Sequence, residues 1–498
     1  MVPRPTLAAR RACWRRPLLA LLLSIAACAE PRLSGGPPES AVEPAAALAP
    51  LPGPRSAAEL EELVDAVMAH EMEQQHIPGA AFVFVQRGRV VLLKGYGVAD
   101  LATGRAVDPR TTIWRIGSIS KVFTADAVLQ LAERGQIDLE ADVNAYLRRV
   151  KVPEAFGQPV RASQLLSHTA GFDEIRPGTQ AADQGGVLPL AQFLAPRLER
   201  ISPPGAVIAY STYGMTLAGL LVEEVSGQTY ADFLRENLWQ PLAMDRTCID
   251  VPAAWKEDVA VGYEYEDGGY VPQPWEWYHT TPASSINSTA EDMAAWLLMH
   301  LGRGRCGEAE VMSPATMDDM LRQHATGHPR IAGLAYGWVE NLETGYPRYL
   351  DHGGNMAGFS SEALIIPERD AGFFLVHQRE NANLRDPLRW AILERFYRDP
   401  TAPQPPGAAS GADMSRFVGR YAWNTWCHTC EGRTPGLVFD VTAAGDGSLV
   451  VNDRSWVEVE PLFFLRDDGA ARLAFGADPE GRIAHMFFGG LWVFEKLP

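Results

Sequence analysis

A serine and a lysine lie three residues apart in the segment 114–121, where their side chains could do chemistry together. The residues after Lys121 carry apolar side chains at 122, 125, 128, 129 and 132, which is helical spacing. We therefore expect Ser118 and Lys121 on one face at the start of a helix. A serine hydroxyl attacks a carbonyl only once a base takes its proton, and a buried lysine with a lowered pKa can be that base. A serine at a helix start followed by a solvated lysine would give the same four-residue pattern at 118–121. The catalytic interpretation therefore needs further motifs in the sequence.

Three further segments bear on that chemistry. Tyr210 precedes a helical pattern in the segment 204–214, and its phenol can donate or accept a proton. His352 comes just before a glycine pair in the segment 351–355, and glycine beside a strand lets a substrate backbone approach closely. The third segment, Leu-Leu-Ser-His-Thr-Ala-Gly at 165–171, is interpreted as a structural turn.

Together with the Ser-x-x-Lys tetrad, these motifs resemble the serine β-lactamase and penicillin-binding-protein family. The resemblance is to the branch of β-lactamase-related serine hydrolases that holds class C enzymes, esterases and D-peptidases. It covers residues 56–398, with the motifs in the order of the family. It implies an α/β (α+β) fold, in which an antiparallel sheet is flanked by helices and carries a mostly helical insertion.

The resemblance also implies roles for the motif residues. Ser118 would be the acylated nucleophile and Lys121 its proton acceptor. Tyr210 would be the second general acid/base, working as a phenolate or through Lys121. The backbone N–H groups of Ser118 and Asn355 would form the oxyanion hole.

The substrate-binding side departs from the pattern of the family at two positions. Thr212 stands where an asparagine side chain commonly holds a substrate amide, and its reach is shorter. His352, with Gly354 beside it on the strand that lines the cleft, stands where strong β-lactamases carry lysine. Its hold on a substrate carboxylate would depend on protonation near pH 6.5. Both departures favour esters or D-amino-acid-containing peptides as substrates.

The sequence therefore predicts a serine hydrolase that works through a covalent acyl-enzyme on Ser118. The alternatives are a class C-like β-lactamase, or a penicillin-binding or sensor protein with little turnover. The expected partner is a small ester, peptide or β-lactam-like molecule. We expect neither a cofactor nor a metal, and a net charge of −17 argues against a nucleic-acid partner. The pattern leaves the oligomeric state open.

The first 28 residues have the pattern of an export signal, with arginines followed by a short apolar run. The run ends in Ile-Ala-Ala-Cys, which resembles a lipobox, so we expect lipidation of Cys28 and a membrane-anchored lipoprotein facing the periplasm or the extracellular side. An ordinary cleaved signal and twin-arginine export are the alternatives. Residues 29–55 are rich in proline, alanine and glycine and are predicted to be a flexible linker.

The predicted body, residues 56–398, begins and ends with strand patterns and has helices between them. Such an order indicates one sheet built from both ends. Helices are expected at 56–76, 213–226, 230–239, 391–396 and after 288–291, and strands at 80–85, 90–93, 335–339, 360–366 and 372–377.

A second linker is predicted at 399–412, followed by an all-β module at 413–498. Six short apolar runs separated by turns indicate a small barrel or sandwich there. Cys427 and Cys430 are expected to form a small disulfide loop or to remain two thiols, with a metal site as a less favoured alternative. The pairing of Cys248 with Cys306 stays open at this point.

Overall fold

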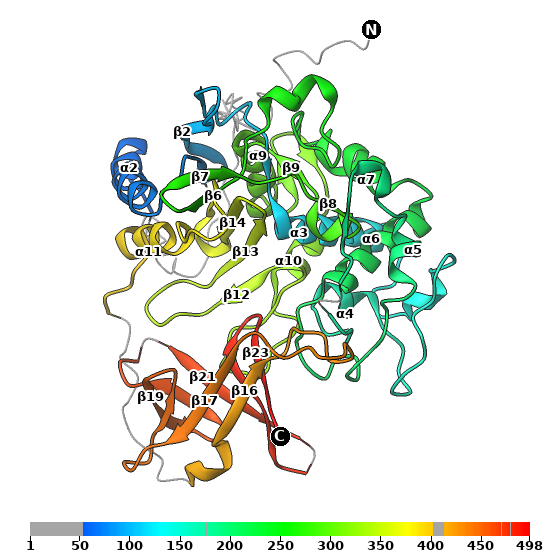
Figure 1. Cartoon of the computed structure of the whole chain (residues 1–498), viewed down its shortest axis with the longest axis vertical. Coiled ribbons are helices and arrows are strands. Elements are labelled where there is room, and N and C mark those ends of the chain that lie inside the picture. The colour runs from blue at the N-terminus through cyan, green and yellow to red at the C-terminus, as the bar shows by residue number, and fades with distance from the viewer. Residues whose placement is uncertain (1–52, 175–176, 402–412, 470, 479) are drawn as a thin grey trace, which may run out of the picture.

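The computed structural model describes residues 53–174, 177–401, 413–469, 471–478 and 480–498. The predicted signal with Cys28, the linker up to residue 52 and the linker segment 402–412 lie outside the described residues. Figure 1 shows a large α/β body with a smaller all-β barrel beneath it.

The body is organised around one seven-stranded antiparallel sheet with the order β12-β13-β14-β15-β1-β2-β3. The first strands of the body pair with the last ones, because β1 lies against β15. The sheet is therefore built from both ends of the body, as predicted. Its strands are β1 (Gly79–Gln86), β2 (Arg89–Asp100), β3 (Arg105–Ala106), β12 (Val339–Asn341), β13 (Tyr349–Met356), β14 (Phe359–Ile366) and β15 (Ala371–Gln378).

Both faces of this sheet are covered, and β1 is buried along its whole length. Side chains alternate across a strand, so Phe82 and Phe84 join a core with helices α2 (Ala57–Gln74) and α11 (Arg385–Phe396). Val83 and Val85 join the larger core on the opposite face, which includes α9 (Ala290–Leu301). Burial on both faces explains the continuous apolar run from which the strand was predicted.

The helical region lies between β3 and β12. Its helices are α3 (Ser120–Glu133), α4 (Ala162–Leu166), α5 (Leu190–Leu194), α6 (Thr212–Ser226), α7 (Tyr230–Leu234), α8 (Thr281–Ser284), α9 and α10 (Pro314–Leu321), with the short turns η1 (Gly117–Ile119), η2 (Val143–Ala145), η3 (Gln184–Gly186), η4 (Arg235–Trp239) and η5 (Ala253–Asp258). Its short strands are β4 (Trp114–Arg115), β5 (Gln180–Ala181), β6 (Tyr263–Glu266), β7 (Gly269–Pro272), β8 (Trp277–Tyr278), β9 (Asn287–Ser288), β10 (Arg305–Cys306) and β11 (Ala309–Glu310), and η6 (Pro367–Arg369) joins β14 to β15. None of the helices in the described part of the chain is both long and apolar enough to cross a membrane.

The C-terminal module is a closed eight-stranded barrel, which resolves the choice between barrel and sandwich. After the turn η7 (Met414–Phe417) its strands are β16 (Gly419–Trp423), β17 (Val438–Ala443), β18 (Leu449–Val451), β19 (Arg454–Glu460), β20 (Phe463–Arg466), β21 (Arg472–Ala477), β22 (Ile483–Gly489) and β23 (Trp492–Lys496). Strand β16 pairs with both β17 and β23, which closes the sheet and leaves no free edge.

Several predicted elements differ from the structure in their limits. The strand predicted at 335–339 is wrong, because β12 begins only at Val339 and the residues before it form a bend that follows an isolated bridge at Leu334. The barrel strands β19 and β22 were not predicted, since polar residues interrupt their apolar pattern. Helix α9 follows residues 288–289 and is capped by Thr289, whose hydroxyl accepts from Asp292 N. Helix α2, predicted at 56–76, is capped by Ser56, whose hydroxyl accepts from Glu59 N.

Candidate active site

The predicted nucleophile, Ser118, lies in the tight turn η1 immediately before helix α3. Gly117 opens this turn with φ of +55°, a conformation that side chains with a Cβ rarely adopt. The turn is anchored on both sides, because Ile116 N donates to Ile286 O over 3.2 Å and the Ser361 hydroxyl donates to Ile116 O over 2.9 Å. Ser118 is thereby held at the surface of a cavity, on a turn whose neighbours are buried.

Lys121 follows one turn later on α3, and its side chain is 1% exposed. Its Nζ lies 3.1 Å from Ser118 Oγ and donates to Ala283 O over 3.0 Å. Burial lowers the pKa of Lys121 from its ordinary value of 10.5 to about 7, against a smaller opposing effect of Glu174. A lysine that is partly neutral at pH 7 and touches the serine hydroxyl can accept its proton.

Tyr210 lines the same cavity as Ser118, and the side chains of the two residues form a hydrogen bond. Lys121 Nζ is 4.7 Å from the centre of the Tyr210 ring, and the His168 ring lies 4.7 Å from it, centre to centre. Burial raises the pKa of Tyr210 well above its ordinary value. The phenol is therefore protonated near neutral pH, which favours its use as a proton donor over the phenolate alternative.

A buried carboxylate, Glu174, holds the segment that carries Tyr210. Its Oε1 accepts from the Ser211 hydroxyl over 2.5 Å and from Tyr213 N over 3.0 Å. Burial raises the pKa of Glu174 to about 7. Ser211 also caps helix α6 by accepting from Gly214 N, so Glu174 sits at a helix N-terminus, where a negative charge is favoured.

Strand β13 passes close to the nucleophile turn because it carries glycine there. A Cβ on Gly354 would lie 2.0 Å from Ile116 O, and one on Gly117 would lie 2.9 Å from Asn355 N. Both distances are shorter than real contacts allow. The backbone of Asn355 therefore lies beside the Ser118 turn, as the predicted oxyanion hole requires.

His352 faces the same site from β13 and is 3% exposed. Its Nδ1 lies 2.7 Å from Gly353 O, a pure acceptor, so Nδ1 carries the proton. The Nε2 atom has no hydrogen-bond partner among the described residues. Burial, helped by the nearby charge of Lys121, lowers the pKa of His352 to about 3. The expected protonation near pH 6.5 is therefore wrong, and His352 offers a neutral acceptor.

Thr212, the second predicted departure, begins helix α6 two residues after Tyr210. It is partly exposed, but it is not among the residues that line the cavity with Ser118. His168, interpreted as part of a structural turn, has φ of +53° and is buried. Its Nδ1 accepts from Ser211 N over 3.0 Å, so it also holds the Tyr210 segment.

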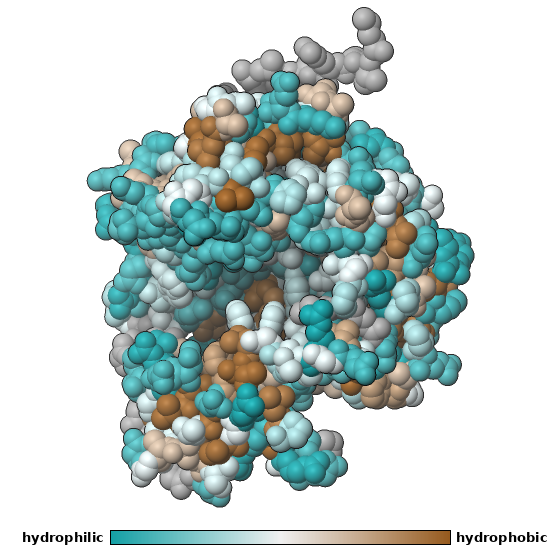
Figure 2. All heavy atoms as spheres, viewed as in Figure 1, coloured by the Kyte–Doolittle hydropathy of each residue, from teal (hydrophilic) through white to brown (hydrophobic). Residues whose placement is uncertain are grey.

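The cavity at Ser118 has a volume of about 910 Å³ and is bounded by both the body and the barrel. Figure 2 shows a recess on this face between the two parts. The body contributes Ser118, Tyr210, His352 and Asn355 among other residues, and the barrel contributes an apolar wall of Trp423, Phe488, Leu491 and Trp492. A volume of this size accommodates a ligand of several residues or rings.

The barrel is held to the body by an apolar contact in which Ile208, Ile331 and Leu334 of the body meet a patch of the barrel. The barrel residues of this patch are Phe463, Leu465, Ala474, Phe487 and Val493. An ion pair between Arg330 and Glu460 lies at the same interface. This packing brings the aromatic wall to the cavity that Ser118 lines.

The aromatic residues near 275–278 line a different cavity of about 560 Å³. Arg115 lies there with its guanidinium 4.5 Å from the Trp275 ring centre. Ser118 does not line this cavity, so we assign these aromatic residues no part in the acyl chemistry.

The cysteines of the barrel form a disulfide between Cys427 and Cys430. Two sulfurs joined in this way are not thiolate ligands, so the metal alternative at this pair is wrong. Cys248 is a buried free thiol and does not pair with Cys306. Within the described residues no group of three or more histidine, cysteine or acidic side chains could hold a metal ion.

Three features of this site were not predicted from the sequence. Glu174 lies three residues after the motif at 165–171, but nothing local indicates that it folds back onto Ser211. The Ala283 carbonyl that binds Lys121 is equally remote in sequence. The aromatic wall of the barrel had no signal beyond its apolar runs, because docking of the barrel decides what it faces.

A family model described as beta-lactamase matches residues 64–396, which is most of the body. The chain belongs to the beta-lactamase family. Members of this family share the mixed α/β fold described above, and the motif residues fall inside the matched range.

Curated relatives of this beta-lactamase family member include the protein flp of Staphylococcus aureus (strain MRSA252), 26% identical over 325 residues, or 64% of this chain. The chain spans 62% of the length of that protein. Penicillin-binding protein 4 of Amycolatopsis lactamdurans is 29% identical over 308 residues, covering 59% of this chain and 79% of its own length.

Solved structures show the same fold. SurE aligns with a TM-score of 0.62 and 21% identity over 88% of this chain and 99% of its own. The octameric penicillin-binding protein homologue of Pyrococcus abyssi aligns with a TM-score of 0.58 and 21% identity over 88% of this chain and 99% of its own. A class C β-lactamase of Rhodobacter sphaeroides aligns with a TM-score of 0.56 and 22% identity over 66% of this chain and 98% of its own. The first two alignments are too long to be confined to the body, so they extend into the barrel.

Proposed function

We propose that this beta-lactamase family member is a serine hydrolase that forms a covalent acyl-enzyme on Ser118 and acts on esters or D-amino-acid-containing peptides. The single observation that carries the proposal is the contact of 3.1 Å between Ser118 Oγ and the buried Lys121 amine. With the pKa of Lys121 lowered to about 7, this amine can take the serine proton at neutral pH.

In the proposed reaction Ser118 Oγ forms a bond to the acyl carbon while its proton passes to Lys121. The N–H groups of Ser118 and Asn355 stabilise the oxyanion, each by about 3 kcal/mol. The bond to the leaving group then breaks, and the Tyr210 phenol donates a proton to the departing oxygen or nitrogen. Water then attacks the acyl carbon and its proton passes to the Tyr210 phenolate left by the first step. The bond between Ser118 Oγ and the acyl carbon breaks, and Lys121 returns its proton to Ser118 Oγ.

The charge of His352 and the shape of the cavity support this substrate class. A lysine on β13 would offer a permanent cation to a substrate carboxylate, whereas His352 is neutral because burial lowers its pKa to about 3. Its bare Nε2 instead suits a substrate N–H or O–H donor. The cavity of about 910 Å³ and its aromatic wall favour an extended or amphipathic acyl group.

The test is a substrate panel of p-nitrophenyl butyrate, a D-Ala-D-Ala peptide and nitrocefin, with wild type and Ser118→Ala. We expect turnover of the ester or the peptide, loss of at least 1,000-fold in Ser118→Ala and little nitrocefin hydrolysis, since triad-type nucleophiles contribute about this much or more. Rapid nitrocefin hydrolysis would favour the β-lactamase alternative. Labelling by a fluorescent penicillin without turnover would favour a penicillin-binding or sensor protein. Wild-type turnover in Ser118→Ala would refute the nucleophile.

We propose further that the chain is exported and anchored to a membrane through a lipid on Cys28. The disulfide between Cys427 and Cys430 supports an oxidising compartment, because such bonds are rare in the cytosol. The full-length protein should partition into the detergent phase, and Cys28→Ser should move it to the aqueous phase. A wild type that stays aqueous would contradict the anchor.

A further inference from the structure

A loop of the barrel, residues 424–430, contacts the two body segments that hold Tyr210. The first contact is direct: Asn424 Nδ2 donates to Ile208 O over 2.7 Å. Asn424 is 6% exposed and Ile208 is 4% exposed, so this hydrogen bond is shielded from water. It fixes the backbone two residues before Tyr210.

The second contact runs through Asp173, whose side chain is fully buried. Its carboxylate accepts from His428 N over 2.8 Å, from Thr429 N over 3.1 Å and from the Thr429 hydroxyl over 2.6 Å. Burial alone would raise the pKa of Asp173, but the side chains of His428 and Thr429, together with the N–H groups of both residues, hold it well below its ordinary value. Several hydrogen bonds to one buried charge make this a strong contact.

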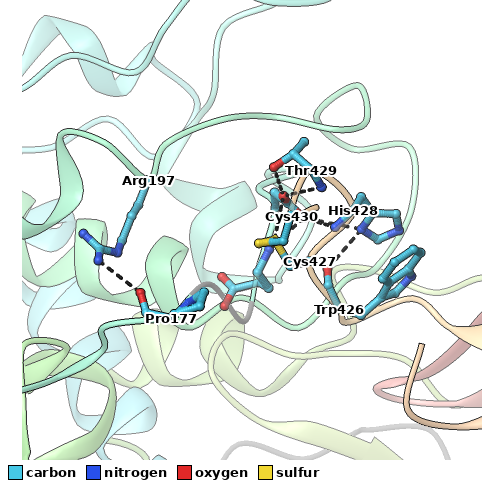
Figure 3. The surroundings of a disulfide bond; sticks show 9 residues. Pro177, Arg197, Trp426, Cys427, His428, Thr429 and Cys430 are labelled. Carbon is cyan, nitrogen blue, oxygen red and sulfur yellow. Dashed lines mark hydrogen bonds and ion pairs between the residues drawn. A yellow bond between two sulfur atoms is a disulfide. The ribbon is translucent and has the colours of Figure 1, made fainter. Parts of the chain in front are cut away.

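The disulfide gives the barrel loop the shape that this contact needs. Figure 3 shows Cys427 joined to Cys430, with His428 and Thr429 between them. The bond closes a loop of four residues and so restricts the directions of the two N–H groups. His428 Nε2 also lies 2.9 Å from Glu495 Oε1 of β23, which ties the loop to the barrel wall.

From Asp173 the contact continues to the residues around Tyr210. Glu174 N donates to Asp173 Oδ1 over 3.1 Å, and the Glu174 carboxylate in turn holds Ser211 and Tyr213. The barrel loop therefore reaches Tyr210 from both sides, through Ile208 before it and through Ser211 after it. Every link in this chain of contacts is buried or partly buried.

We propose that the disulfide-closed loop 424–430 positions Tyr210, and that Asp173 is the positioning residue through which it acts. The inference rests on the proposed function of Tyr210 at Ser118. Docking of the barrel does not depend on Asp173 alone, because the apolar contact around Ile331 and the ion pair of Arg330 with Glu460 join the same two parts. Proton transfer by Tyr210 is thereby made dependent on the presence of the barrel.

The test measures the second-order rate at which a fluorophosphonate labels Ser118 in the full chain. In this reaction the Ser118 oxygen bonds to phosphorus, its proton passes to Lys121, and fluoride leaves while the Tyr210 phenol donates a hydrogen bond to it. We compare Asp173→Ala with Glu460→Ala, a control that removes a different contact of the same interface, the ion pair with Arg330. Both are repeated in the Tyr210→Phe background, and thermal unfolding is recorded for each variant.

We expect Asp173→Ala to slow labelling about 10- to 100-fold, since displacing a catalytic group by about 1 Å can cost this much. Glu460→Ala should change the labelling rate less than about twofold. In the Tyr210→Phe background, Asp173→Ala should also change the labelling rate less than about twofold, because the effects of coupled residues are not additive. Asp173→Asn, which keeps one acceptor oxygen, should restore part of the rate.

Two outcomes separate this inference from the proposed function. The positioning role is refuted if Asp173→Ala is labelled as fast as wild type. It is also refuted if Asp173→Ala slows labelling by the same factor with Tyr210 present and in the Tyr210→Phe background. If Asp173→Ala fails to fold, Asn424→Ala provides the same comparison through Ile208. If wild type is not labelled at all, the proposed function fails, and the inference fails with it because Tyr210 has no acyl transfer to serve.

Discussion

Lys121 is expected to set the acidic limb of the pH–rate profile. The amine must be neutral to take the proton of Ser118, so kcat/KM rises with pH through the pKa of Lys121 and levels off above it. Burial lowers that pKa to about 7. About half of the enzyme is therefore competent at pH 7, whereas a solvated lysine with a pKa near 10.4 would be neutral in only about 1 molecule in 2,500.

The corresponding free energy is large enough to measure. Lowering the pKa from 10.5 to about 7 disfavours the charged amine by about 5 kcal/mol relative to water, at 1.36 kcal/mol for each pH unit. Below about pH 6, kcat/KM should fall close to tenfold for each unit of pH.

The assay is the rate of fluorophosphonate labelling between pH 5 and pH 9, which avoids titration of a leaving group in that range. Lys121→Arg is the control, because arginine stays protonated throughout and should give a slow rate at every pH. Circular dichroism at each pH confirms that the fold persists. A flat wild-type profile, or a midpoint near pH 10, would refute the role of the buried amine.

Three further predictions concern the surroundings of this pair. Glu174→Gln removes a negative charge that favours protonated Lys121, so the acidic limb of the same profile should move to lower pH; a shift to higher pH would contradict the argument. Gly354→Ala would place a Cβ against the backbone oxygen of Ile116, so it should lower the melting temperature and slow labelling of Ser118 at least tenfold. Gly445 has open space around it, so Gly445→Ala should change neither the melting temperature nor the labelling rate. Trp492→Ala should raise KM several-fold for a peptide or large acyl ester but not for an acetyl ester, since the side chain lines the far wall of the cavity; equal effects on both would argue against a binding wall.

The parts of the fold that were predicted are those encoded by neighbouring residues. The β1–β2 hairpin follows from two apolar runs joined by Arg87 and Gly88, and its register is local. Helix α2 follows from its period and the cap at Ser56. Strand β12 was misplaced because the aromatic run before Val339 is buried without being part of the sheet, and an apolar run alone does not distinguish the two.

In the candidate active site, too, the features set by neighbouring residues could be predicted and those set by distant segments could not. The closeness of Ser118 and Lys121 is set by one helical turn, so it could be predicted from their spacing. The charge state of His352 could not be predicted, because its pKa depends on burial in the folded body and on the charge of Lys121, which lies far away in the chain. The same holds for Glu174, whose partner Ser211 is brought to it only by the folded body.

By itself the sequence determined the chemical groups of the site, since a serine, a lysine and a tyrosine in ordered motifs carry acyl chemistry whatever surrounds them. The tertiary structure decided their ionisation and their exposure. Desolvation of Lys121 and of His352 is a property of the packed interior, and the wall formed by Trp492 exists only once the barrel docks on the body. Spacing encodes contacts within a turn, whereas solvent exclusion arises from chain segments that meet only on folding.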